Sequence, residues 1–118
     1  MKKHKSKGIE IYLALVKEFP LRPFESVHNE EHYYAKYMNF QGFVVDAYTT
    51  NDYVSIPTGV DVDRNSDVFY FWGAENFYDL ESAKKQVMKI ISEAKQIQVQ
   101  VKKDEIDGDF VKLNLHKN

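Results

Sequence analysis

The spacing of apolar residues predicts two helices. In residues 9–19 the apolar positions fit a helical stripe and a strand alternation equally well. We expect a helix because the run is long, contains Ala and Leu, and ends before Pro20, whose predecessor is disfavoured in helical conformation. Residues 79–96 repeat apolar side chains at helical spacing behind Asp79, a good N-cap residue. They predict an amphipathic helix that packs one face on a sheet.

Strand signals fill the middle of the chain, where 13 of the 17 aromatic residues fall between Tyr33 and Tyr78. Four runs are expected to be strands: residues 32–40, 42–50, 53–56 and 68–72. The first two are expected to pair as a hairpin around Gln41 and Gly42. Alternation divides the side chains of the second strand into two sets: Phe43, Val45 and Ala47 on one face, and Asp46 and Tyr48 on the other.

The run at residues 68–72 is apolar on both faces, which suits a strand that is covered on each side. We therefore expect it in the middle of the sheet, ending at Gly73. By contrast, residues 20–31 contain two prolines and are expected to form a loop.

Every second residue is apolar in two segments near the C-terminus, residues 97–101 and 111–115. The Asp107-Gly108 dipeptide between them is a turn signal. A loop of residues 106–108 would place the apolar residues of both segments on one face, so we expect a β-hairpin. An exposed edge strand in this hairpin would allow pairing with a second copy, in which case the protein is a structural subunit of a homo-oligomer.

Together these elements predict an α+β fold in a single domain, residues 9–118. The expected architecture is a mainly antiparallel sheet of about five strands with an N-terminal helix, an amphipathic helix near 79–96 and a C-terminal β-hairpin. The length of 118 residues fits one domain, and the mean hydropathy of -0.53 leaves no room for a membrane span. The absence of Cys excludes disulfides and thiolate sites and favours the cell interior, so we expect a cytoplasmic protein.

The net charge of -2 conceals an asymmetry. Residues 1–8 are expected to be a flexible arm whose positive charges are Lys2, Lys3, Lys5 and Lys7. The remaining residues hold 12 basic groups against 18 acidic ones. A basic arm suits contact with phosphates, whereas an acidic body repels them and suits a basic protein partner.

Two segments partly match metal-binding motifs. Residues 28–32 fit the H-x-x-E-H zinc-protease signature through His28 and His32, but the flanking prolines and predicted strand leave no helix to carry it. Residues 61–67 resemble the start of an EF-hand loop, but Ser66 stands where the motif needs Gly and Trp72 where it needs Glu. We interpret the first as a polar, solvated loop end and the second as a turn in which Asp and Asn side chains bond to their own backbone. We assign no metal.

Catalytic motifs are absent from the sequence. The five glycines are too far apart for a phosphate-binding loop, and no Ser sits in a G-x-S-x-G motif. The other two histidines, His4 and His116, lie in terminal segments. We therefore expect a protein that is not an enzyme and needs no cofactor.

The first functional hypothesis is a protein-binding module in which exposed tyrosines anchor an interface rimmed by acidic groups. Its candidate residues are Asp61, Asp63, Asp67, Glu75, Asp79, Glu81, Tyr37 and Tyr48. Such a surface suits a host protein with a basic surface, including a nucleic-acid-binding defence enzyme that it would inhibit. The small size, acidic body and Lys-rich composition are typical of accessory proteins of phages and mobile elements.

The alternative hypothesis is a single-stranded nucleic-acid binder. Sheet tyrosines would stack on unpaired bases and the Lys arm would contact phosphates. The candidate residues are Lys2, Lys3, Lys5, Lys7, Tyr33 and Tyr34. Within residues 33–78 only Lys36 and Arg64 are basic, which weighs against this hypothesis.

Overall fold

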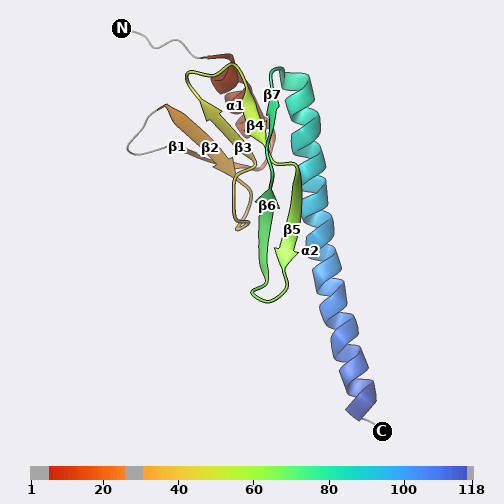
Figure 1. The fold of residues 1–118 in the computed structure, drawn as a ribbon. Coiled ribbons are helices and arrows are strands. Elements are labelled where there is room, and N and C mark those ends of the chain that lie inside the picture. The colour runs from red at the N-terminus through yellow and green to blue at the C-terminus, as the bar shows by residue number, and fades with distance from the viewer. Residues whose placement is uncertain (1–5, 26–30, 117–118) are drawn as a thin grey trace.

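The computed structural model describes the backbone of residues 6–25 and 31–116, and the side chains of these residues as far as residue 106. The elements are α1 (Lys7–Glu18), β1 (Arg22–Glu25), β2 (His32–Lys36), β3 (Val45–Tyr48), β4 (Val54–Ile56), β5 (Gly59–Asp63), β6 (Val68–Trp72), β7 (Glu75–Phe77) and α2 (Leu80–His116). The fold is α+β, as the sequence predicted. Figure 1 shows α1 behind the main sheet and α2 running along the molecule past the β5–β6 hairpin.

The main sheet contains five antiparallel strands in the order β1-β2-β3-β4-β7. β2 and β3 pair as predicted, with His32 opposite Tyr48. The strands end earlier than expected, because residues 37–44 form a longer connection that returns Phe40 to the core. In this connection the Gln41 N–H donates to the Phe69 carbonyl of β6 at 2.9 Å. The pairing is therefore confirmed, whereas the expected turn at Gln41 and Gly42 is wrong.

One face of this sheet packs against both helices and forms the core. The buried strand residues alternate along the chain and are small or β-branched: Ala35, Val45, Ala47, Val54 and Ile56. The helices cover them with stripes at helical spacing: Ile9, Tyr12 and Leu15 from α1, and Ala83, Val87, Ile90 and Ala94 from α2. The amphipathic helix predicted near 79–96 thus buries the expected side, whereas in α1 Leu13 of the apolar stripe is 41% exposed.

Each predicted helix begins with a cap. The Ser6 hydroxyl accepts from the Ile9 N–H at 3.2 Å, so α1 begins at Lys7 and ends before Pro20. Lys7 and Gly8 are therefore helical, and the expected arm of residues 1–8 is wrong for these two. At the start of α2, a carboxylate oxygen of Asp79 accepts from the Ser82 N–H at 2.9 Å, which confirms the predicted N-cap.

The prediction of a C-terminal β-hairpin is wrong, because α2 continues without interruption from Leu80 to His116. Alternation at Ile97, Val99 and Val101 also fits a helix, since Ile97 and Val101 are four residues apart and share a helix face. Val101 is 7% exposed and continues the core stripe, whereas Val99 is 68% exposed. Gly108 costs a helix only about 1 kcal/mol relative to Ala, which is too little to end one by itself.

The strand at residues 68–72 is not in the middle of the main sheet. It is β6, and it pairs with β5 in a separate two-stranded sheet. The β2–β3 connection covers one side of it, since Phe40 stacks on Phe69 and Phe71 at centroid distances of 5.0 and 5.1 Å. Trp72 is 49% exposed, so the expectation that the strand is covered on each side is wrong. Gly73 ends the strand as predicted, with φ +76°.

Three strands were missed: β1, β5 and β7. β1 lies in the predicted loop of residues 20–31, and Pro23 is tolerated there because β1 is an edge strand. β5 contains the first part of the Asp-rich segment, so Asp61 and Asp63 belong to a strand rather than to a turn. The predicted turn follows, where the Asp63 carboxylate accepts from the Asn65 N–H at 2.9 Å.

Candidate binding surface

The second face of the main sheet carries no helix within the described residues, and we call it the open face (Figure 1). Its side chains come from alternate positions of the five strands and from the β2–β3 connection: Arg22, Phe24, His32, Tyr34, Lys36, Phe43, Asp46, Tyr48, Ser55 and Asn76. An uncovered sheet face with this many aromatic residues is a candidate binding surface.

Five rings of the open face contact one another, and we call them the aromatic row: Phe24, Tyr34, His32, Tyr48 and Phe43. Phe24 stacks on Tyr34 at a centroid distance of 5.4 Å, and His32 stacks on Tyr48 at 4.4 Å. Tyr34 and His32 join the two stacks at 5.3 Å. Phe24, Phe43 and Tyr48 are 38%, 37% and 38% exposed, so the row presents large ring surfaces to solvent.

The charges of the open face are separated. Arg22 and Lys36 lie at one end, 5.8 and 6.0 Å from the Phe24 ring centroid, and Arg22 also donates to the Met38 carbonyl. Asp46 lies near the middle, where its Oδ1 accepts from His32 Nε2. The His32 and Asp46 side chains are only 19% and 23% exposed, so this pair is partly removed from water.

Tyr12 of α1 supports the open face from the core side. Its hydroxyl donates to the Tyr34 carbonyl at 2.8 Å and lies 3.4 Å from the Phe24 carbonyl, so it contacts both β1 and β2. Burial raises the pKa of the Tyr12 hydroxyl to about 12, so it remains a donor even above pH 10, where a free tyrosine ionises. The first helix thereby fixes the two strands that carry the Phe24–Tyr34 stack.

Phe43 does not share a face with Val45 and Ala47, contrary to the sequence prediction. Gly42 has φ +89°, and the bend that follows breaks the alternation, so that Val44 and Val45 are both buried. Phe43 therefore projects onto the opposite face, where its ring lies 4.8 Å from Tyr34.

A pocket lies where the open face meets the β5–β6 hairpin, and we call it the Asp46 pocket. Its volume is about 240 Å³, and its walls are Gly42, Phe43, Asp46, Ser55, Ile56, Pro57, Phe71, Gly73 and Ala74. Asp46 supplies its charge, and the Ser55 hydroxyl donates to Asn76 Oδ1 at 2.8 Å.

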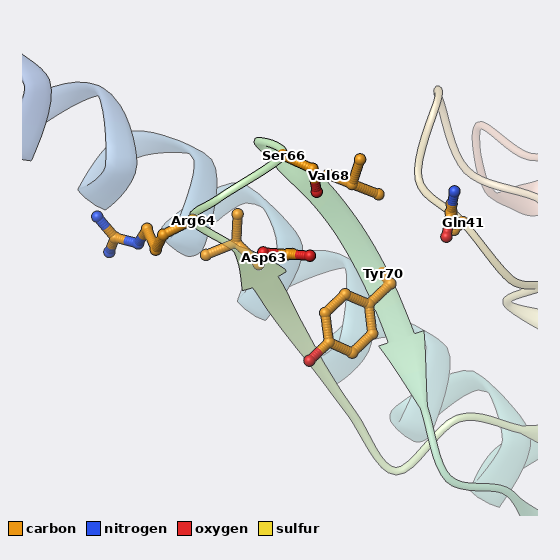
Figure 2. Close-up of a pocket in the computed structure, with 7 residues that line it drawn as sticks. Gln41, Asp63, Arg64, Ser66, Val68 and Tyr70 are labelled. Atoms are coloured by element: carbon orange, nitrogen blue, oxygen red, sulfur yellow. The ribbon is translucent and has the colours of Figure 1, made fainter.

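A wider depression of about 520 Å³ lies on the β5–β6 hairpin, between Asp63, Tyr70 and Gln41 (Figure 2). Figure 2 shows Arg64 turned away from it toward α2, in agreement with the 3.0 Å ion pair between Arg64 and Asp104. Both of its charged residues are already engaged, since Asp63 bonds to the turn backbone and Arg64 pairs with Asp104 of α2. This depression is a weaker candidate than the open face.

The acidic residues predicted for partner binding do not gather on the aromatic surface. Asp61, Asp63 and Asp67 lie on the β5–β6 hairpin and its turn, whereas Glu75, Asp79 and Glu81 lie in β7 and at the start of α2 (Figure 1). Tyr48 is on the open face. Tyr37 is 4% exposed and packs edge-on against Phe40 in the core, so its assignment to a binding surface is wrong.

The residues predicted for nucleic-acid contact are also divided. Tyr34 belongs to the aromatic row, whereas Tyr33 pairs with Ala47 on the core face and packs 5.8 Å from Tyr12. Lys7 is in α1, and Lys2, Lys3 and Lys5 lie outside the described residues. The described chain begins at Ser6, whose hydroxyl donates to the Tyr48 carbonyl at 3.3 Å.

Of the two candidate metal-binding histidines, His28 lies outside the described residues, and His32 opens β2 and contacts Asp46 instead of ending a solvated loop. In the part of the chain that the structure describes, no group of three or more His, Asp or Glu side chains is placed to hold a metal ion.

Sequence reasoning included Phe24, His32, Phe43 and Asp46 in neither candidate binding surface. Phe24 was assigned to a predicted loop. Arg22 and Phe24 are two residues apart, so in a strand they would lie on the same face. His32 and Asp46 could have been found from the predicted strands, since alternation places His32 on the face of Tyr34 and Asp46 on the face of Tyr48.

The chain matches no known protein family, no curated protein and no solved structure. Within the described residues, neither helix combines the length and the apolar character that a membrane span requires.

Proposed function

We propose that this protein is a non-catalytic binding protein that docks a protein partner on its open face. The observation that carries the proposal is the aromatic row, in which Phe24, Phe43 and Tyr48 are each more than one-third exposed on a sheet face that no described helix covers. Protein interfaces are enriched in aromatic residues and Arg at their centre and carry a polar rim. Arg22, Ser55 and Asn76 border the row in this way.

The position of Asp46 favours a protein over a nucleic acid. Proteins that bind single strands combine stacking rings with a cationic groove that follows the phosphates. Here the cations Arg22 and Lys36 lie together beside Phe24, whereas a carboxylate lies among the other rings. A partner with basic side chains, as the composition suggested, would meet this carboxylate favourably. Inhibition of a host protein, as by a phage accessory protein, would need only such a surface.

The test is affinity capture from the native host with the wild-type chain, Phe24→Ala, Tyr48→Ala and the control Met88→Ala. Met88 is 58% exposed on α2 and lies outside the open face, so it controls for the loss of an exposed apolar side chain. We expect a protein that the wild type and Met88→Ala retain and that both open-face variants lose. If the wild type and all three variants capture the same protein, or if none of them captures one, docking on the open face is contradicted.

The same variants test the two alternatives. Fluorescence anisotropy with single-stranded DNA and RNA at low salt is expected to show no binding below tens of micromolar, about where non-specific affinities begin. Binding that Phe24→Ala abolishes would replace the protein partner by a nucleic acid. Sedimentation of the purified chain is expected to show no dimer that depends on Tyr48, and such a dimer would make the partner a second copy.

A further inference from the structure

The Asp46 pocket is assembled from segments that are far apart in the chain. Gly42 and Phe43 come from the β2–β3 connection, Asp46 from β3, Ser55 from β4 and Gly73 from the end of β6. Its volume of about 240 Å³ lies below the 300 Å³ or so at which pockets for drug-sized ligands begin. A space of this size fits one side chain of a partner better than a whole small molecule.

Two glycines with positive φ shape its walls. Gly42 has φ +89° and Gly73 has φ +76°. A Cβ on Gly73 would lie 2.5 Å from the Thr58 hydroxyl oxygen, so this position requires glycine for space as well as for conformation. The backbone is therefore held in a shape that brings the end of β6 close to the open face.

The chemistry of the walls is that of an acceptor site with flat apolar sides. Phe43 and Phe71 supply most of the apolar surface, since Pro57 is buried and Ile56 is 0% exposed. The Asp46 carboxylate accepts hydrogen bonds only, and His32 contacts it at Oδ1. Because the Ser55 hydroxyl gives its proton to Asn76, its remaining capacity toward the pocket is to accept.

We infer that the Asp46 pocket receives an arginine side chain of the protein partner. A guanidinium group is planar, carries several N–H donors and a positive charge, and stacks on aromatic rings, so it matches the carboxylate and the Phe43 ring together. A lysine ammonium would satisfy the charge but not the planar stacking, and an acidic side chain would be repelled. His32 acts here as a positioning residue that holds the carboxylate.

This inference rests on the proposed function, but a small probe tests it without the partner. The probe is an acetylated and amidated Gly-Arg-Gly peptide, titrated into the isotopically labelled full chain and followed by NMR. We expect saturable shifts at the amides of Phe43, Asp46, Ser55 and Ala74, with a dissociation constant on the order of millimolar for so small a ligand. The matched peptide with citrulline keeps the shape of arginine and removes its charge, so it is expected to bind about tenfold more weakly or not at all. The lysine peptide is expected to fall between the two.

Variants locate the probe. Asp46→Asn is expected to remove the response, whereas Asp61→Asn, which neutralises an exposed carboxylate of β5, is expected to keep it. Phe43→Leu preserves an apolar wall without an aromatic face and is expected to weaken binding severalfold, so it covers the case in which Asp46→Asn disturbs the sheet. Equal responses to arginine and citrulline, or shifts that lie elsewhere, would overturn the inference.

The outcome is separable from that of the proposed function. Loss of capture by Phe24→Ala together with no response to the arginine peptide would refute the pocket and leave docking on the open face intact. A response that Asp46→Asn abolishes, together with capture unchanged by Phe24→Ala, would support the pocket and refute docking through the aromatic row.

Discussion

The two faces of the main sheet differ in what their side chains do. The core face carries small or β-branched residues such as Ala35 and Val54, which are fully buried and let two helices approach closely. The open face carries large rings and charges on the same strands, and Phe24 and Tyr48 remain 38% exposed. Because successive side chains of a strand point to opposite faces, one set of strands serves both purposes. Substitutions on the core face should therefore change stability, and substitutions on the open face should change binding.

The largest expected effect is on the core face. Ile90→Ala removes a side chain that is 0% exposed between α2 and the sheet, and it should lower the free energy of unfolding by about 2–5 kcal/mol. Met88→Ala, two residues earlier and 58% exposed, should change it by less than about 0.5 kcal/mol. Urea denaturation measures both values, and similar losses in the two variants would contradict the placement of α2.

The next effect concerns the contact between α1 and the β3–β4 turn. A Cβ on Gly8 would lie 2.5 Å from the Tyr53 carbonyl oxygen and 2.6 Å from that of Asn51. Replacing Gly by Ala within a helix usually gains up to about 1 kcal/mol. Here the steric clash should reverse the sign, and Gly8→Ala should lower stability by about 1–3 kcal/mol. A higher melting temperature for this variant would show that α1 does not lie so close to the turn.

Tyr12→Phe tests the link between the two faces. It leaves the Tyr34 carbonyl without its 2.8 Å donor and should cost about 1–2 kcal/mol near neutral pH. The effect should depend on pH, because the folded pKa of Tyr12 is raised to about 12 while an unfolded tyrosine ionises near 10. Stabilisation by the protonated hydroxyl is complete below pH 10 and is lost as the pH rises through 12. The difference in stability between wild type and Tyr12→Phe should therefore shrink in that window, and a constant difference would refute the buried donor.

Local signals explain what could be predicted from the sequence. The α+β class, the helix after Asp79 and the β2–β3 pairing follow from caps, periodicity and aromatic content, which act over a few residues. The prediction for the C-terminal segment was wrong because the alternation at Ile97, Val99 and Val101 fits a strand and a helix equally. The segment is helical because it continues α2.

The candidate site depends on long-range packing, which the pattern does not contain. Which face of the sheet stays open is decided by where α1 and α2 pack, and Phe24 joins the aromatic row only because β1 pairs with β2. The acidic residues were correctly recognised as exposed, but their separation into two groups, on the β5–β6 hairpin and near the start of α2, follows from this hairpin leaving the main sheet.

The smallest expected change in stability gives the sharpest test of the comparison between the faces. Tyr48 and Ala47 are neighbours in β3, with Ala47 1% and Tyr48 38% exposed. Tyr48→Ala removes mainly the stack on His32, and such ring pairs contribute about 0.5–1.5 kcal/mol. Because Tyr48 is solvent-exposed on one side, we expect a loss below about 1 kcal/mol together with loss of partner capture. Ala47→Leu, which forces a larger side chain against α1, should lower stability by about 1–3 kcal/mol. A larger loss for Tyr48→Ala than for Ala47→Leu would mean that the aromatic row stabilises the fold, and its exposed rings would then be no argument for a binding surface.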